Sequence, residues 1–111
     1  TPAKINGETW YVRFVDSYHP ILRMENGDFT IGTCDDNTKT IYLANHLEGN
    51  LLRKVLSHEI VHSAMFSYNV MLTYEQEELL ADIIATYGRE IITNANDMFK
   101  RLQLCRQCHQ L

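Results

Sequence analysis

Residues 48–66 read EGNLLRKVLSHEIVHSAMF, a stretch that combines a helical period with closely spaced ionisable side chains. Its apolar residues recur at intervals of three and four, which places them along one side of a helix: Leu51, Leu52, Val55, Leu56, Ile60, Met65 and Phe66. We therefore predict a helix from about Glu48 to Phe66. Asn69 is a candidate for its end.

The sequence before this helix alternates between apolar and polar residues, as half-buried strands do. Polar turn signals separate the candidate strands, and the best of these turns is Cys34-Asp35-Asp36-Asn37. We predict strands over 9–15, 21–24, 29–33 and 39–44. The short connections favour an antiparallel meander of three or four strands.

The sequence after this helix predicts two more helices. Thr73 can cap the first of them, with Gln76 three residues later as in a capping box. We expect its apolar positions to face inward: Leu79, Leu80, Ile83, Ile84 and Tyr87. A third helix over 94–107 has an apolar side that we also assign to the core. Strands followed by helices indicate an α+β fold, with residues 1–111 forming a single domain.

Composition excludes several functional classes. A net charge of −4 argues against a general nucleic-acid-binding protein, which usually carries a basic face. No apolar run reaches the roughly 18 residues that span a bilayer, so we expect no membrane partner. Three cysteines do not form the even framework of a secreted disulfide-rich domain, and no signal peptide is visible, so we expect a cytoplasmic protein.

His58-Glu59-Ile60-Val61-His62 is an H-E-x-x-H motif within the first predicted helix. Residues four apart lie on the same helix face, so both imidazoles can reach one ion. Zn²⁺ binds imidazole nitrogen in a tetrahedral shell, and a catalytic zinc keeps one position open for water. Glu59 is the candidate base that takes a proton from this metal-bound water.

A catalytic zinc of this type needs a third protein ligand, and the next predicted helix offers four acids: Glu75, Glu77, Glu78 and Asp82. Glu75 and Glu77 can instead be surface acids that the dipole of the helix N-terminus stabilises. Helical facing favours Glu78, because positions 78 and 82 form one row beside the apolar positions. Glu77 stays the alternative ligand.

With these residues the chain resembles the gluzincin metallopeptidases, whose third ligand is a Glu on the helix after the motif. Glu78-Leu79-Leu80-Ala81-Asp82 matches the spacing of the thermolysin-like branch, in which an Asp follows that Glu by four residues. The resemblance implies a small zincin-like fold, Glu78 as third ligand and Asp82 as acceptor of a hydrogen bond from His58. It covers residues 28–92, and the order of elements is similar to minigluzincins and to metallopeptidase-like proteins of phages and mobile elements.

The same resemblance implies how a substrate binds. In these enzymes the strand before the active helix is the sheet edge, so Lys39–Ala44 would pair with an extended peptide. The Tyr or His that stabilises the oxyanion in larger relatives has no matched position here. Tyr74, Tyr87 and His109 are candidates.

The sequence therefore predicts a zinc-dependent metalloprotease acting on a protein or peptide substrate. The alternative is a catalytically weak or inactive zincin-like module that binds a partner protein. Glu59 favours the enzyme, because a purely structural zinc has four protein ligands and no need for a base.

Cys105-Arg106-Gln107-Cys108-His109 also matches the C-x-x-C-H attachment pattern of c-type haem. No export signal and no second axial ligand accompany the motif, so we do not expect haem. The cysteine pair is more typical of packing, of an adventitious metal or of a local disulfide.

Overall fold

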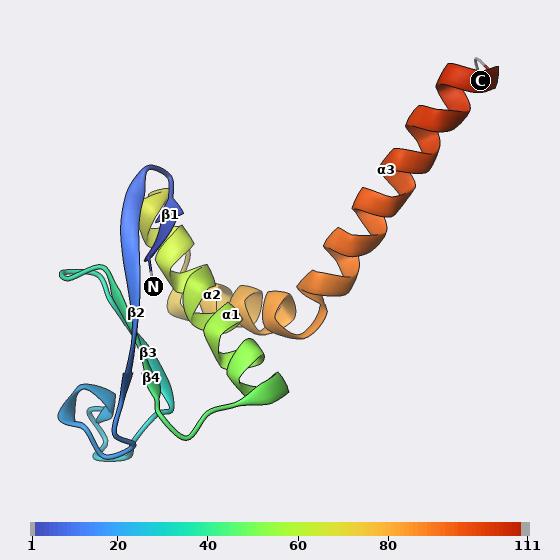
Figure 1. Cartoon of the computed structure of the whole chain (residues 1–111). Coiled ribbons are helices and arrows are strands. Elements are labelled where there is room, and N and C mark those ends of the chain that lie inside the picture. Colours follow the sequence, from blue (N-terminus) through green and yellow to red (C-terminus); the bar gives the residue numbers. More distant parts are fainter. Residues whose placement is uncertain (1, 110–111) are drawn as a thin grey trace.

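The computed structural model describes residues 2–109, in which a four-stranded sheet precedes the long helices (Figure 1). In chain order the elements are β1 (Pro2–Ile5), β2 (Glu8–Val15), the 3₁₀ helix η1 (Pro20–Leu22), β3 (Gly32–Asp35), β4 (Thr40–Ala44), α1 (Gly49–Ser67), α2 (Tyr74–Ile83), the π-helical segment η2 (Ile84–Gly88) and α3 (Arg89–His109). This order confirms the α+β class.

The sheet is mixed, with strand order β1-β2-β4-β3. The two outer pairings are antiparallel, but β2 and β4 run parallel, with Tyr11 opposite Thr40 and Val15 opposite Ala44. The predicted antiparallel meander is therefore wrong at its centre. The chain crosses over through η1 after β2, so the β3–β4 hairpin inserts β4 between β2 and β3. Lys39–Ala44 is consequently not the sheet edge, and β3 forms that edge instead.

Three local features differ from the predicted strands. Residues 21–24 do not form a strand: the His19 side chain accepts a hydrogen bond from the Ile21 amide and caps η1. The strand predicted over 29–33 lies later, as β3. An additional strand, β1, pairs with β2 through a two-residue turn at Asn6-Gly7, where both residues have positive φ. Such a turn matches the twist of a hairpin and requires residues that tolerate this backbone.

The core lies between the sheet and α1 (Figure 1). Trp10 is buried in β2, and its indole N–H donates to Ser67 Oγ at 2.7 Å, which ties the hairpin to the end of α1. The other buried core residues are Leu22, Ile41, Leu43, Ala44 and Leu47. Asn69 has a φ of +57°, and α1 ends just before it, as predicted.

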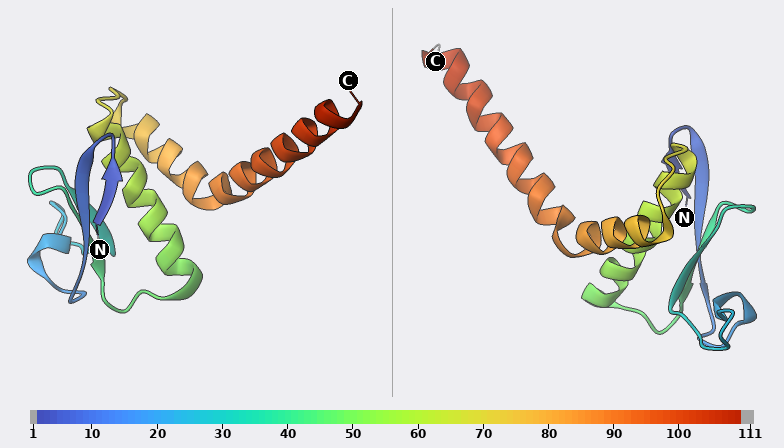
Figure 2. Two further views of the ribbon diagram at one scale, coloured as in Figure 1. Left: turned by 45° about the horizontal axis from the view of Figure 1, so that its top comes forward. Right: turned by 180° about the vertical axis from the view of Figure 1, so that it is seen from behind.

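The final helix is longer and more isolated than the sequence predicts. α2 continues through η2 into α3, and the axis bends at this junction, so that α3 projects away from the sheet and α1 (Figures 1 and 2). The apolar side of α3 is exposed rather than buried, with Met98 53% and Leu102 56% accessible. Within the described helices, none is both long enough and apolar enough to cross a bilayer.

Gly32 sets how closely the edge strand β3 approaches α1. A Cβ atom at this position would lie 2.7 Å from Cγ1 of Val55 and 3.3 Å from Cγ of Glu59. A separation of 2.7 Å is far below van der Waals contact, so strand and helix touch through a residue without a side chain. The sheet edge is thereby held directly over Glu59.

We predict that Gly32→Ala lowers the free energy of unfolding by about 1–3 kcal/mol, the usual cost of overpacking. Urea denaturation measures this change. Val55→Ala removes the clashing methyl group, so the double variant should lose less stability than the two single losses added together. Additive losses, or an unchanged Gly32→Ala variant, would contradict the proposed contact.

Candidate metal centre

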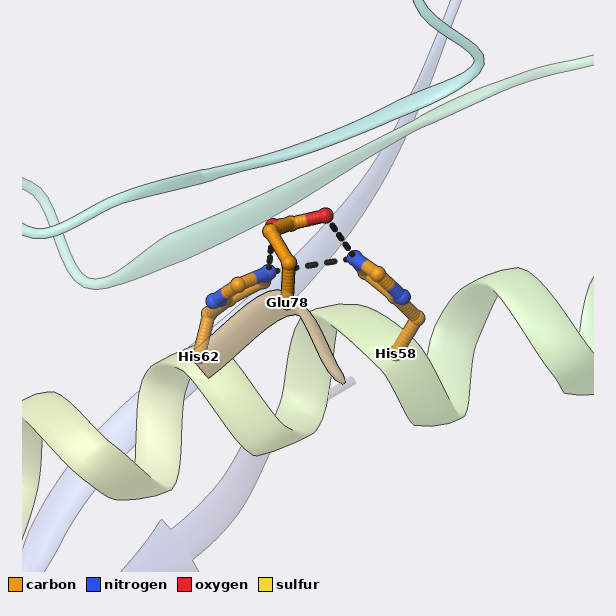
Figure 3. Close-up of side chains that lie close together, drawn as sticks. All are labelled: His58, His62 and Glu78. Atoms are coloured by element: carbon orange, nitrogen blue, oxygen red, sulfur yellow. Dashed lines mark hydrogen bonds and ion pairs between the residues drawn. The ribbon is translucent and has the colours of Figure 1, made fainter. Parts of the chain in front are cut away.

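His58 and His62 point from α1 toward Glu78 on α2, and three ligand atoms meet there (Figure 3). The two Nε2 atoms lie 3.1 Å apart. Glu78 Oε1 lies 2.8 Å from His62 Nε2, and Glu78 Oε2 lies 3.4 Å from His58 Nε2. The structure thus brings together the three residues predicted as ligands, all of them half-buried.

These spacings fit a tetrahedral ion. Ligand atoms about 2.05 Å from zinc in a tetrahedron are separated by about 3.3 Å. The separation of the two Nε2 atoms and the contact of each with a carboxylate oxygen of Glu78 lie within 0.5 Å of that value, although the two imidazoles contact different oxygens of Glu78. One ligand atom from each residue can be chosen so that all three lie within 4.8 Å of one another. Two imidazole nitrogens and one carboxylate oxygen are also a donor set that zinc accepts, with a fourth position left for water.

The outer nitrogen of each imidazole contacts its own carboxylate. His58 Nδ1 lies 3.0 Å from Asp82 Oδ1, the pair that the sequence analysis placed together. His62 Nδ1 lies 2.5 Å from Glu77 Oε2. Because an ionised carboxylate only accepts hydrogen bonds, each Nδ1 carries the proton. Neutral imidazoles then direct both Nε2 lone pairs at the same point, which favours a cation there.

The face of α2 that carries these acids is not the one expected from the apolar pattern. The buried or half-buried positions of α2 and η2 are Glu77, Glu78, Leu80, Ala81, Ala85 and Gly88, and Ala81 is fully buried. Of the apolar positions predicted to face inward, Leu80 is half-buried, whereas Leu79, Ile83, Ile84 and Tyr87 are exposed. The capping box of Thr73 and Gln76 is confirmed, with both hydrogen bonds formed. It fixes where α2 begins and therefore which acids face α1.

Glu77 has a role that the sequence left open. It is neither a solvated surface acid nor part of the three-residue cluster that could hold an ion, because it binds the outer nitrogen of His62. The sequence spacing is consistent with this role. His58 and His62 lie four residues apart on α1, Asp82 and Glu77 lie five apart on α2, and each acid contacts one histidine. Carboxylates in this position orient the ring and make the ligand more basic.

Glu59 lies on the side of α1 that faces β3, beside the two histidines. It is buried, with 8% of its surface accessible, and its carboxylate reaches the space beneath Gly32. Burial raises the pKa of Glu59, and His62 and His58 in their protonated forms only partly oppose this effect. The structure therefore places the predicted base next to the ligand cluster, in surroundings that increase its affinity for a proton.

Burial and the neighbouring carboxylates shift the pKa of His62 in opposite directions. Burial alone lowers the pKa of His62, but the hydrogen bond to Glu77 and the charges of Glu59 and Glu78 together raise it above its ordinary value. The surrounding carboxylates thus stabilise positive charge at this point of the site. A proton and a metal ion compete for the same charge-stabilising position.

The cluster opens into a cavity of about 760 Å³. One wall comes from β3 and the residues around it, and the opposite wall from the loop between α1 and α2 with Tyr74. Residues that line it include Gly32, Cys34, Glu59, Met65, Val70, Met71, Leu72 and Tyr74. Both tyrosines proposed for oxyanion stabilisation are exposed, Tyr74 with 76% and Tyr87 with 56% of its surface accessible, but Tyr74 lines this cavity and Tyr87 does not. The side chains of Cys108 and His109 lie outside the described part of the chain.

Cys34 lines the same cavity and is the thiol to consider as a competing ligand. Burial raises the pKa of its thiol to about 12, which keeps it protonated at neutral pH. Its sulfur lies 3.3 Å from Ser63 Oγ, and Ser63 in turn donates to the Glu59 carbonyl oxygen. Cys34 therefore packs against Ser63, the residue that follows the motif in α1, and is not part of the three-residue cluster.

The raised pKa of His62 predicts how zinc affinity depends on pH. Binding needs the neutral imidazole, so affinity should fall as pH drops through this pKa, which lies above the ordinary value of about 6.5. Glu77→Gln removes a contact that raises the pKa, so the fall should begin at a lower pH. The affinity at high pH should also drop, by about 10–100-fold.

Competition with a chromophoric chelator across the pH range measures both effects. Glu75→Gln is the matched control, because Glu75 is exposed in the same helical turn and contacts neither histidine. An identical pH midpoint in wild type and Glu77→Gln would contradict the assigned role of Glu77.

Comparison of this chain with protein families, with curated proteins and with solved structures finds no match.

Proposed function

We propose that this protein is a zinc-dependent peptidase of the gluzincin kind, in which His58, His62 and Glu78 hold the metal. The observation that carries the proposal is the meeting of three ligand atoms beside the buried carboxylate of Glu59, at a cavity large enough for a peptide segment. When bound, zinc acts as a Lewis acid and lowers the pKa of a bound water to about 7.

Glu59 supplies the proton transfers of the proposed reaction. Its carboxylate takes a proton from the attacking water, whose oxygen bonds to the carbonyl carbon of the substrate. The same group then delivers that proton to the amide nitrogen as the C–N bond breaks. A carboxylate with a raised pKa holds the proton more readily between these two steps, which suits a group that acts first as base and then as acid.

The edge strand β3 is the proposed binding surface for the substrate backbone. β3 pairs with β4 on one side only, so its other side presents backbone N–H and C=O groups to the cavity. An extended peptide can pair with such an edge as an added strand. Gly32 and Thr33 then lie opposite the ligand cluster, and the substrate is an extended segment of a protein or peptide.

Tyr74 is the proposed partner of the oxyanion. It precedes Glu78 by four residues, so both side chains lie on one face of α2, and Tyr74 lines the cavity. A phenolic O–H can donate to the negative oxygen that forms as water adds to the carbonyl.

The alternative is a module that keeps the zinc but only binds a partner. Glu59 distinguishes the two functions. Within residues 2–109 its carboxylate has no side-chain hydrogen bond, although it is buried and faces the cavity. Burying such an acid costs stability, and a site used only for binding gains nothing from that cost.

We predict that the wild type binds one zinc per chain and cleaves unfolded casein. Glu59→Gln should keep the zinc and lose nearly all activity, whereas His62→Ala should lose both. Elemental analysis and a labelled-casein assay measure the two properties. Glu48→Gln, an exposed Glu to Gln change at the start of α1, is the control that should match wild type. Zinc bound without proteolysis in the wild type would favour the binding module, and no zinc after reconstitution would reject both functions.

Tyr74→Phe should lower kcat by about 10²–10³-fold, as loss of one oxyanion donor usually does, and leave zinc content unchanged. Steady-state kinetics on a peptide cleaved by the wild type measure this effect. Tyr87→Phe removes the equivalent hydroxyl outside the cavity and should have wild-type kinetics. Equal rates for Tyr74→Phe and wild type would exclude Tyr74 from this role.

A further inference from the structure

α3 presents an apolar surface that nothing in the described chain covers. The helix runs for 21 residues away from the sheet, and its main contact is with η2, from which it continues (Figures 1 and 2). Its large apolar side chains are all more than half exposed: Ile91, Ile92, Met98, Phe99, Leu102 and Leu104. An exposed stripe of this length is typical of an interaction surface rather than of a monomer's free surface.

The spacing of this stripe indicates the shape of its partner. Ile91, Ala95, Met98, Leu102 and Cys105 follow one another at alternating intervals of four and three residues. This is the heptad seam of a helix that packs lengthwise against another helix. Ile92 and Phe99, one heptad apart, widen the seam on one side.

The charges on α3 are divided between its two halves. The first half carries Glu90 and Asp97 against a single cation, Arg89, whereas the second half, up to Arg106, carries Lys100, Arg101 and Arg106 and no carboxylate. Parallel pairing of two such helices would place the three cations of one beside those of the other. Antiparallel pairing places the acidic half of each helix beside the basic half of its partner, so the helix is complementary to itself.

We propose that α3 pairs antiparallel with α3 of a second copy of this chain, which makes the protein a homodimer. The contact is isologous, because each copy offers the same surface and the same charge order. It lies on the projecting helix, away from the ligand cluster on α1 and α2, so the dimer leaves the cavity open and does not depend on the proposed peptidase function.

Sedimentation equilibrium of the whole chain tests the association. The wild type should have twice the mass of one chain at micromolar concentration, and Met98→Glu/Leu102→Glu should be monomeric. Asn96→Glu/Gln103→Glu adds the same two charges to the opposite side of α3 and should stay dimeric. All three proteins should have equal zinc content, which shows that the α1–α2 site is folded. A monomeric wild type, or a dimeric Met98→Glu/Leu102→Glu variant, would overturn the proposal.

Spin labels test the orientation. In chains whose native cysteines are replaced by alanine, and whose dimeric mass is verified, one population is labelled at Thr93 and another at Gln103. Antiparallel helices predict that the distance between a label at 93 and one at 103 in mixed dimers is shorter than the distance between two labels at 93. The reverse order would establish a parallel dimer and overturn the proposed pairing.

Discussion

The contact between α1 and α2 depends on three carboxylates placed around two imidazoles. Glu77 and Asp82 contact the outer nitrogens of His62 and His58, and Glu78 lies between the inner nitrogens. This arrangement forces α2 to turn its acids and small residues toward α1. A helix contact made of polar and small side chains gains little from apolar burial, so its stability depends on the charges being matched. A cation held at the shared point, as proposed, would complete that match and tie the two helices together.

The orientation of α2 has a consequence for the rest of the chain. Because the acidic face points inward, the apolar residues of α2 and of the continuous α3 point outward. The sheet supplies the opposite wall of the site, where Gly32 allows β3 to approach Glu59 without a side chain in between. The same edge strand that confines the base also offers unpaired backbone groups to the cavity. The facing of α2 therefore determines both the proposed metal site and the exposed apolar surface of α3.

The sequence was most informative about features that depend on residues close together in the chain. The i, i+4 spacing of His58 and His62, that of Glu78 and Asp82, and the capping box of Thr73 depend only on helical geometry. In the structure the two histidines lie side by side, Glu78 and Asp82 both contact His58, and the capping box is formed. The turn at Asn6-Gly7 is equally local, since an Asn-Gly pair favours the two-residue hairpin turn that joins β1 to β2. Non-local features were harder. The residues of β4 give one indication of its central position: both faces of the strand carry apolar or small side chains, as expected of an interior strand. Apolar stripes on α2 and α3 were assigned to the core because periodicity shows that a face is apolar, not what covers it.

The central claim is that two imidazoles of α1 and one carboxylate of α2 bind a zinc ion that keeps a free position. X-ray absorption spectroscopy of the protein loaded with one equivalent of zinc tests this claim most directly. The structure predicts two imidazole nitrogens and oxygen ligands at about 2.0–2.2 Å, with no sulfur. In His62→Ala the imidazole scattering should fall or the zinc should be lost. Sulfur scattering at about 2.3 Å, or a shell without imidazole, would show that zinc binds elsewhere and would contradict the account.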